Sequence, residues 1–361
     1  MNRTTALTWS WLNVLTAKRY SALMQVYSNL DTALSEISEN MLRELGCREE
    51  TMMIVMNRLD EFDPAAYEAE LAKRDLKLIS IEDEEYPAQL KTIADPPTFL
   101  YYSGDLSVLD QPCIALVGKR EMSSYGQRVT ESFVPDFVRA GMVTVSGLAY
   151  GIDAVVAKET IAAGGKTVAA LGHGLGMIHP KSNVVLAKEI VANGGLILSE
   201  YPLDARPDKH TFPGRNRIIA GLSLGTVVLE AGEGSGALIT VDLALDYGRD
   251  VFAVPGQVFD PNYIGCHQVI AKGTAKLVMS AADVLNEIGV VAGQSQEKES
   301  TYKPSNAVEE AIIKVLTTMP QSSGDIVQKA GLETGVINSA LTMMELAGAA
   351  KNVGGGQWVK N

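Results

Sequence analysis

Apolar residues recur at steps of three and four through residues 1–75, as at Leu12 and Leu15 and again at Leu23 and Val26. This spacing places apolar side chains on one face of a helix. The charged stretches between them are typical of solvated faces and loops. The pattern therefore predicts a small all-helical domain at the N-terminus.

The pattern changes over residues 76–292, where short apolar, β-branched runs alternate with helical periodicity. This alternation predicts βαβ units and a mainly parallel sheet, so the expected fold class is α/β and doubly wound. The expected strands are 113–117, 142–145, 167–171, 196–199, 226–229 and 251–254, and the expected helices are 125–140, 152–163, 183–193 and 238–247. Ligands of such folds bind beyond the carboxyl ends of the strands.

Residues 293–306 contain Gln, Ser, Glu and Lys with almost no apolar residues, which predicts a linker. Three short helical patterns and a glycine-containing hairpin follow over 307–361, in the order of a winged helix. The expected recognition helix, 336–346, contains Glu345 but no Lys or Arg. Since readers of duplex DNA need such donors, we expect this unit to contact protein or to do little.

Chain length limits the number of domains, and net charge limits the kinds of nucleic-acid binding that are expected. A chain of 361 residues exceeds the size of one hydrophobic core, so two or three domains are expected. The net charge of −12 argues against a general nucleic-acid coat, because Lys and Arg supply most of the non-specific affinity for phosphate. Any DNA site must be a local basic cleft on an acidic protein.

The expected location and the expected lack of a metal site both rest on features that the sequence does not contain. There is no secretory leader and no apolar run of membrane-spanning length, so a cytoplasmic protein without a membrane partner is expected. Cys47, Cys113 and Cys266 are too far apart for a disulfide framework or a metal clip, and the four histidines lack metal-ligand spacing. We expect no metal site.

The first turn that favours anion binding follows the strand 113–117 and leads through residues 118–126 into a helix. Such a turn directs backbone N–H groups and a helix dipole at an anion, and Arg120 can bind a phosphate with two hydrogen bonds. An ordinary turn with a serine N-cap is the alternative. The turn is not GxGxxG, and the next strand lacks the acidic residue that holds a ribose, so a nicotinamide cofactor is not expected.

Three further glycine-containing turns, at 146–153, 172–176 and 230–236, also follow expected strands. Glycine lets a ligand approach the backbone closely. One such turn is weak evidence, but four at successive strand ends predict a long anion-binding rim.

The segment 204–219 is locally basic, since Arg206, Lys209, Arg215 and Arg217 outnumber two aspartates. Phe212 lies among these cations. Cations that follow a backbone, together with an aromatic platform, suit unpaired nucleic acid. In the alternative, Phe212 belongs to the core and the two later arginines pair with Glu200 or Glu230.

Catalytic chemistry has little support in the sequence. Asp153, Glu200, Glu230 and Asp242 are carboxylates, but no Ser, Cys or His accompanies them at motif spacing. We expect them to form structural pairs, and we expect no enzyme.

Five motifs in chain order resemble the DprA/Smf (DNA-processing protein A) family. They read GKREMSSYG at 118–126, SGLAYGID at 146–153, FPGRNRIIAGLS at 212–223, SGALIT at 235–240 and VPG at 254–256. The resemblance covers about residues 76–291. It implies an extended Rossmann-like domain, flanked by a SAM-like helical domain and a winged helix, which forms a homodimer, binds single-stranded DNA and loads the RecA recombinase on incoming DNA during natural transformation.

By motif, the resemblance implies that Arg120 holds phosphate, that Lys209 contacts DNA and that Phe212 stacks or packs beside it. The DNA-binding residues expected on this basis are Gly118, Lys119, Arg120, Ser123, Ser146, Gly147, Gly174, Lys209, Phe212, Arg215, Asn216, Arg217, Ser235 and Gly236. Family members often carry basic residues where this chain has Gly214, Glu233 and Gly234. This departure predicts weaker binding or a contribution from Lys119.

Two rival functions remain open. Lysine-decarboxylase-like phosphoribohydrolases are Rossmann-type nucleotide-processing enzymes that present a PGGxGT turn before a helix, whereas the corresponding segment here, 230–236, reads EAGEGSG. The second rival is a protein-interaction scaffold with a vestigial rim. Release of a base from a nucleotide indicates the enzyme, and indifference to oligonucleotides at all salt concentrations indicates the scaffold.

Overall fold

The computed structural model describes residues 1–290, 304–317 and 319–360. The chain divides at residue 293 into two compact units, and each is described here by itself. Most of the predicted linker, residues 293–303, lies outside the described residues.

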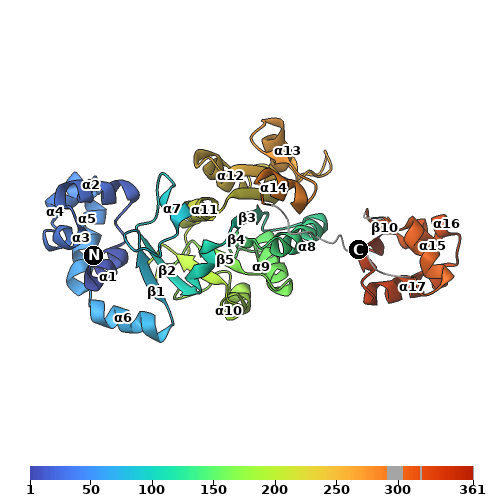
Figure 1. The fold of residues 1–361 in the computed structure, drawn as a ribbon, viewed down its shortest axis with the longest axis horizontal. Coiled ribbons are helices and arrows are strands. Elements are labelled where there is room, and N and C mark those ends of the chain that lie inside the picture. The colour runs from blue at the N-terminus through green and yellow to red at the C-terminus, as the bar shows by residue number, and fades with distance from the viewer. Residues whose placement is uncertain (291–303, 318, 361) are drawn as a thin grey trace. The chain divides into compact units, whose positions relative to one another are not determined.

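A nine-stranded sheet forms the centre of the first unit, in the order β1-β2-β6-β5-β4-β3-β7-β8-β9 (Figure 1). The strands are β1 (Lys77–Ser80), β2 (Phe99–Gly104), β3 (Cys113–Gly118), β4 (Val143–Ser146), β5 (Thr167–Leu171), β6 (Leu196–Ser199), β7 (Gly225–Glu230), β8 (Asp250–Ala253) and β9 (Lys276–Leu277). The pairs β1/β2 and β2/β6 are antiparallel, and the other neighbours are parallel. The predicted fold class is confirmed, and the six predicted strands lie within one residue of the observed ends.

The chain order across the sheet reverses at β3. The chain moves from β3 outward through β4, β5 and β6 on one side, and then through β7, β8 and β9 on the other. The register of the β3/β7 pair also shifts between Val117 and Gly118, at the carboxyl end of β3. Doubly wound sheets have their binding crevice at such a reversal, beyond the carboxyl ends of the strands.

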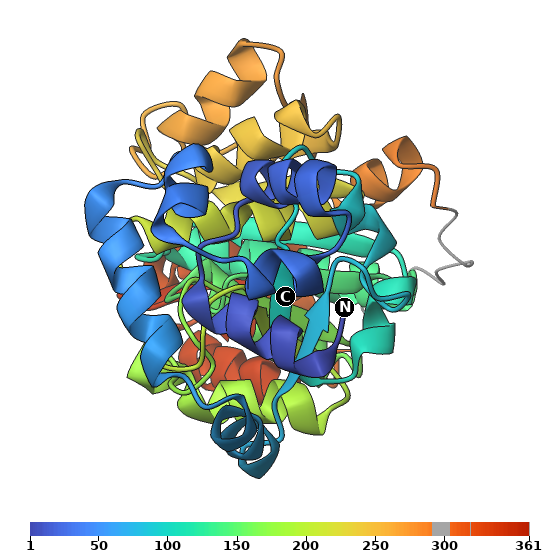
Figure 2. The same ribbon diagram turned by 90° about the vertical axis from the view of Figure 1, so that its left-hand side faces the viewer.

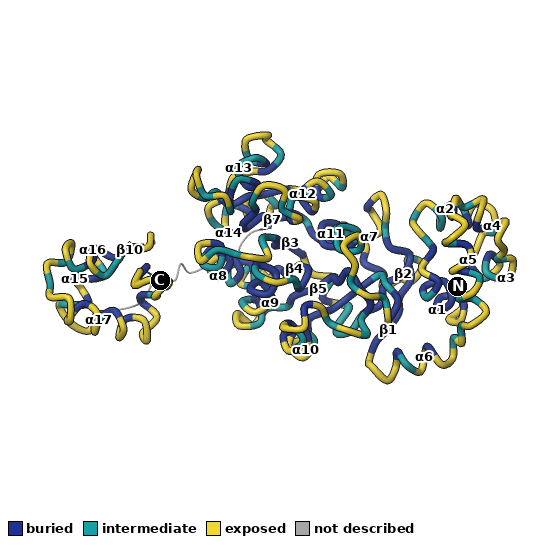
Figure 3. The backbone as a smooth tube through the Cα atoms, turned by 180° about the vertical axis from the view of Figure 1, so that it is seen from behind, coloured by how far each residue is buried: buried dark blue, intermediate teal, exposed yellow. Residues whose placement is uncertain are grey.

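Alternating side chains of β3 enter two separate cores. Cys113, Ala115 and Val117 pack under α7, α11, α12 and α13, whereas Ile114 and Leu116 pack under α8, α9 and α14. The helices are α7 (Ala88–Lys91), α8 (Ser124–Arg139), α9 (Ile152–Ala162), α10 (Val184–Ala192), α11 (Thr211–Leu222), α12 (Ala237–Asp246), α13 (Ile264–Ala271) and α14 (Ala281–Glu287), with short 3₁₀ segments η1 (Leu106–Asp110) and η2 (Lys181–Asn183). Figure 3 shows the buried strands between helices whose outer faces are exposed. Burial on both faces explains the near-continuous apolar runs of the parallel strands.

The predicted N-terminal helices are present, and Asn, Thr or Ser side chains cap several of them, as at Asn2 and Thr16. They are α1 (Arg3–Leu12), α2 (Ala17–Tyr27), α3 (Leu30–Ser35), α4 (Glu39–Glu44), α5 (Glu49–Glu61) and α6 (Pro64–Lys73). Their core continues into the sheet, because it also contains Leu78 of β1 and Tyr101 of β2, and it includes Leu203 from the loop after β6. The helices lie beside β1 and β2 (Figure 2), and the finer division at residue 75 stays a prediction.

The second unit has its own core, which includes Ile312, Leu341 and Trp358. Its elements are α15 (Ala307–Val315), β10 (Gln321–Ser322), α16 (Ser323–Ala330), α17 (Thr334–Leu346), β11 (Ala350–Asn352) and β12 (Gln357–Lys360). The three strands pair in the order β10-β12-β11, and the turn at 354–356 uses three glycines with positive φ. The predicted winged helix is thus confirmed. Val336, Met343 and Leu346 on α17 are exposed.

Candidate nucleic-acid interface

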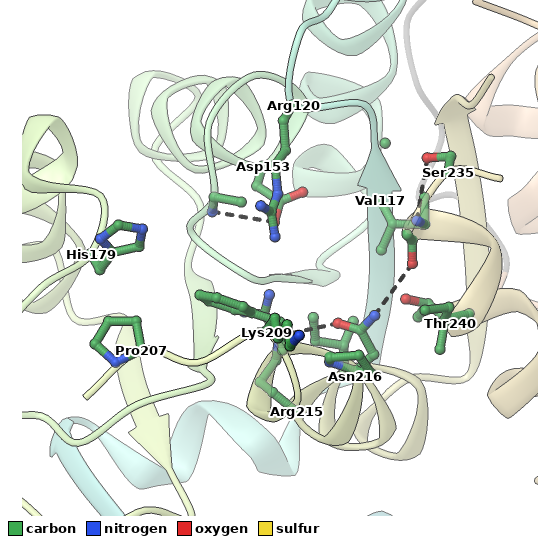
Figure 4. Close-up of a pocket in the computed structure, with 18 of the residues that line it drawn as sticks. Val117, Arg120, Asp153, His179, Pro207, Lys209, Arg215, Asn216, Ser235 and Thr240 are labelled. Carbon is green, nitrogen blue, oxygen red and sulfur yellow. Dashed lines mark hydrogen bonds between the residues drawn. The ribbon is translucent and has the colours of Figure 1, made fainter. Parts of the chain in front are cut away.

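A cleft of about 610 Å³ lies at the point where the strand order reverses. Its walls are the end of β3, the loop before α11, and the first turns of α11 and α12. The lining residues used below are Gly118, Arg120, Asp153, His179, Lys209, Phe212, Arg215, Asn216, Ser235, Gly236, Ile239 and Thr240. Figure 4 shows Arg120 extending from the end of β3 toward α11, with Ser235 and Thr240 on one side and His179 and Pro207 on the other.

Arg120 is exposed, and the turn that carries it packs against the start of α9. Gly151 has φ +70°, and a Cβ there would collide with the carbonyl oxygens of Lys119 and Arg120, so only glycine fits. The Ile152 N–H also donates to the Lys119 carbonyl, at 3.2 Å. The guanidinium of Arg120 lies over the Phe212 ring, 5.2 Å from its centroid. Within the described part of the chain, Arg120 forms no ion pair.

Lys209 and Phe212 come from the start of α11 and the loop before it. The Thr211 hydroxyl contacts the Gly172 carbonyl at 2.5 Å, which joins this helix end to the third glycine-containing turn. The ring of His179 lies 6.2 Å from that of Phe212. Lys209 is exposed and, among the residues that the structure describes, has no acidic partner. Two cations without acidic partners in the described chain therefore line the same cleft as Phe212, and one of them lies over its ring.

Arg215 is buried beneath this surface, with only 4% of its area exposed. Its guanidinium donates to the Gly147 carbonyl at 2.6 Å, to the Ala170 carbonyl, and to Asn216 Oδ1 at 3.2 Å. A Cβ on residue 147 would collide with the guanidinium, which explains the glycine there. These contacts make Arg215 part of the cleft floor.

Asp153 compensates the buried charge of Arg215. Its carboxylate accepts from the N–H groups of Gly147 at 3.0 Å and Ala149 at 3.3 Å. Burial raises the pKa of Asp153, and the nearby Arg215 opposes that rise. Burial likewise lowers the pKa of Arg215 to about 10, against the opposing effect of Asp153. Arg215 therefore stays charged at neutral pH.

One of the four glycine-containing turns, 230–236, brings a helix N-terminus to the cleft, and the loop before α11 brings a second. The first turns of α11 and α12 contribute Phe212, Pro213, Gly236 and Ala237 to its lining. The N-terminus of α8 is already occupied, because Glu230 accepts from the N–H and the hydroxyl of Ser123. The predicted anion-binding rim is thus shorter than four turns, since an internal carboxylate occupies the place of an anion at one of them.

Eight of the fourteen predicted DNA-binding residues line the cleft together: Gly118, Arg120, Lys209, Phe212, Arg215, Asn216, Ser235 and Gly236. The other six lie outside its lining. Ser123 caps α8, Ser146 donates to the Leu116 carbonyl, and Lys119 Nζ lies 2.5 Å from Asn262 Oδ1.

Gly147 and Gly174 pack against internal groups. Arg217 pairs with Glu200 at 2.5 Å and with Asp95 at 3.3 Å, so the alternative of an internal ion pair is correct for this arginine.

Several lining residues were not predicted as site residues, although the sequence contained signals for some of them. Ile239 and Thr240 lie in the SGALIT motif, one turn inside α12, so they face the cleft beside Gly236. Asp153 ends the SGLAYGID motif, but its carboxylate was expected to form a structural pair and not to line a binding site. His179 comes from a segment without any motif, and its proximity to Phe212 follows only from tertiary packing.

The cleft can bind an anionic chain that carries flat groups. Three cations and two carboxylates, Asp153 and Asp208, line it, and Arg215 opposes the first carboxylate. Over the described ranges, no three His, Cys, Asp or Glu side chains gather in a way that could hold a metal ion. No helix of that part is long and apolar enough to cross a membrane.

Comparison with known proteins gives two family matches. The family described as DNA recombination-mediator protein A matches residues 77–289, and the DprA winged helix domain matches residues 296–356. DNA processing protein DprA of Streptococcus pneumoniae is 41% identical over 261 residues, which cover 70% of this chain and 90% of that protein. Protein Smf of Escherichia coli is 36% identical over 288 residues, covering 77% of this chain and 76% of that protein.

Two solved structures are also similar. The X-ray structure of DprA from Streptococcus pneumoniae has a TM-score of 0.67 and 37% identity, covering 80% of this chain and 98% of that one. DprA from Helicobacter pylori, described as having a unique single-stranded DNA binding mode, has a TM-score of 0.53 and 29% identity, covering 59% and 95%.

Proposed function

The chain belongs to the DNA recombination-mediator protein A family, which includes DprA and Smf proteins, and on this premise we propose that it binds single-stranded DNA in the cleft between β3, α11 and α12. One observation carries the proposal: Arg120 and Lys209, both without acidic partners in the described chain, line one cleft with Phe212, and Arg120 lies over the Phe212 ring. The similar structure of DprA from Helicobacter pylori is described by its single-stranded DNA binding mode, which supports single-stranded DNA as the ligand proposed here.

In the proposed mechanism the cations bind phosphates and the ring binds a base. Arg120 and Lys209 reach successive phosphates, and the N–H groups at the starts of α11 and α12 add neutral donors. Arg120 now covers the Phe212 ring. When Arg120 turns to a phosphate, that ring face becomes free for a base, and stacking of this kind tolerates any base.

Arg215 has a different role from the one its charge suggests. Its buried guanidinium holds the carbonyls of Gly147 and Ala170, so it fixes the turn after β4 and the end of β5 beneath the cleft. The positive charge of Arg215 therefore acts on DNA only by raising the electrostatic potential at the floor of the cleft, without direct contact. Arg217 lies outside the cleft lining and is left out of the proposed contacts.

We propose that the protein does no covalent chemistry. The carboxylate of Asp153 is held by two backbone N–H groups beside Arg215, and that of Glu230 is held by Ser123. Neither is free to act as a general base. Incubation with nucleoside monophosphates should release no free base, and release at a rate proportional to protein concentration would favour the phosphoribohydrolase alternative.

The cellular role that we propose is protection of incoming DNA and loading of RecA in the cytoplasm of a transformable host. In a homodimer, the two clefts would form one longer path for the bound DNA strand. The outer edge of β9 supports this assembly, since the exposed Leu277 and Met279 lie at that end of the sheet. If the dimer forms through this edge, Met279→Glu should convert it into a monomer, as measured by light scattering.

The loading role is tested separately: RecA assembly on DNA coated with single-strand-binding protein should accelerate when the wild-type chain is added.

Fluorescence anisotropy tests the binding itself. A labelled oligo(dT) is titrated with the full chain at several salt concentrations, and the matched duplex is the control. We expect tighter binding to the single strand, with affinity falling as salt rises by a slope of about 0.7 for each phosphate held. Equal affinity for the single strand and the duplex, or an affinity that does not change with salt concentration, would overturn the proposal.

A further inference from the structure

The loop that carries Lys209 is anchored in the core of the N-terminal helices. This loop, residues 200–210, connects β6 to α11. Leu203 is only 2% exposed and packs in the same core as Leu71 and Tyr67 of α6. Because Leu203 is packed in this core, α6 contributes to the position of the loop around Leu203.

A directed chain of hydrogen bonds strengthens this anchor. The Leu203 N–H donates to the Tyr67 hydroxyl at 3.1 Å, and the Tyr67 hydroxyl donates to that of Tyr101 at 3.1 Å. Tyr101 donates to Ser10 Oγ at 2.7 Å, and Ser10 donates to the Leu7 carbonyl at 2.9 Å. Each hydroxyl has one acceptor and one donor partner, so α1, α6 and β2 hold one backbone N–H of the loop.

The loop also joins the third glycine-containing turn. The Gly176 N–H donates to the Leu203 carbonyl, and the Gly174 N–H donates to the Ala205 carbonyl, both at 2.9 Å. Arg74, which follows α6, donates to the Gly176 carbonyl at 3.2 Å. The loop is therefore fixed at Leu203 between this turn and the N-terminal helices, four residues before Pro207, the first loop residue that lines the cleft.

We propose that Tyr67 is a positioning residue for DNA binding: its hydroxyl holds the β6–α11 loop so that Lys209 faces the cleft. The inference rests on the proposed function. Lys209 forms no ion pair in the described part of the chain, so its position depends on the backbone of the loop. Preorganisation of that backbone reduces the ordering cost of binding.

Tyr67→Phe removes one hydroxyl and keeps the ring. Tyr86→Phe is the matched control, because Tyr86 is also buried and its hydroxyl donates to the Pro97 carbonyl at 2.7 Å, outside the chain of hydrogen bonds that ends at Leu203. For Tyr67→Phe we expect the Kd for oligo(dT) to rise about threefold to tenfold, the effect of one hydrogen bond, with a shallower salt slope. Tyr86→Phe should leave both unchanged.

A double-mutant cycle with Lys209→Ala decides between positioning and a general structural effect. If Tyr67 acts through Lys209, Tyr67→Phe adds little to Lys209→Ala, and the two variants are strongly non-additive. Additive effects, or an unchanged affinity in Tyr67→Phe, overturn the inference. If Lys209→Ala itself has no effect on affinity or salt slope, the proposed function fails at this residue instead, so the two failures are distinguishable.

A surface pair keeps the inference testable if Tyr67→Phe does not fold. Arg74→Gln removes the bond to the Gly176 carbonyl, whereas Lys73→Gln removes a neighbouring charge that only approaches Glu70, at 3.9 Å. We expect weaker oligo(dT) binding for Arg74→Gln than for Lys73→Gln. Equal binding by these two variants overturns the anchoring role of α6.

Discussion

Replacement of Arg215 by methionine separates the stability of the cleft from its affinity for DNA. The substitution keeps much of the apolar volume but removes the guanidinium that donates to the carbonyls of Gly147 and Ala170. It also leaves the Asp153 carboxylate buried without a nearby cation. Loss of one partner of a buried pair costs about 3–5 kcal/mol, a large part of the roughly 5–15 kcal/mol that stabilises a domain.

Urea denaturation measures this loss. Trp9 and Trp11 report on the first unit once Trp358 is replaced by Phe, since Trp358 belongs to the core of the second. We expect Arg215→Met to lower the unfolding free energy by about 3–5 kcal/mol at an unchanged m-value. Arg120→Met, on the exposed side of the same cleft, should change it by less than about 0.5 kcal/mol. A loss below about 1 kcal/mol for Arg215→Met would refute the account of the cleft floor.

Three further predictions concern other parts of the chain. Arg120→Ala should weaken binding of every oligonucleotide about tenfold or more and reduce the salt slope by about 0.7, as measured by anisotropy; an unchanged slope argues against a phosphate contact. Hydrogen bonds from the N–H groups of Met279 and Ser280 lower the pKa of Asp283 below 3.8, so its contribution to stability is present above that pH and is lost as the pH falls through the lowered value. Asp283→Asn should therefore unfold at lower urea than the wild type at neutral pH, by up to about 1 kcal/mol, and the difference should vanish in acid. The winged helix, tested as residues 305–361, should not shift duplex DNA in a gel, because α17 offers no Lys or Arg; a tight complex contradicts this.

Six of the parallel strands, β3 to β8, were predictable because their signal is local. Each is a short apolar run whose predicted boundaries fall within one residue of the observed ones, whereas the two-residue strand β9 was not predicted. The antiparallel strands β1 and β2 were not predicted, since nothing in their sequences specifies pairing with a strand far along the chain, as Tyr101 does with Ser199. Register of that kind depends on tertiary packing.

The candidate site was predictable by motif but not by orientation. The sequence indicates that Arg120, Arg215 and Arg217 are cations near glycine-containing turns, but it does not distinguish their directions. In α11 the helical rotation of two residues turns Arg217 away from the cleft and toward Glu200 and Asp95, while Arg215 enters the floor. Likewise, nothing local to Ser123 shows that Glu230 occupies the helix end beside it.

Photocrosslinking locates the DNA most directly. Oligo(dT) containing 5-iodouracil is irradiated with the full chain, and the crosslinked peptides are identified by mass spectrometry. The account predicts crosslinks at Phe212 and its neighbours in the first turn of α11, which disappear in Phe212→Ala. Crosslinks confined to the winged helix or to the N-terminal helices would contradict the central claim that this cleft holds the single strand.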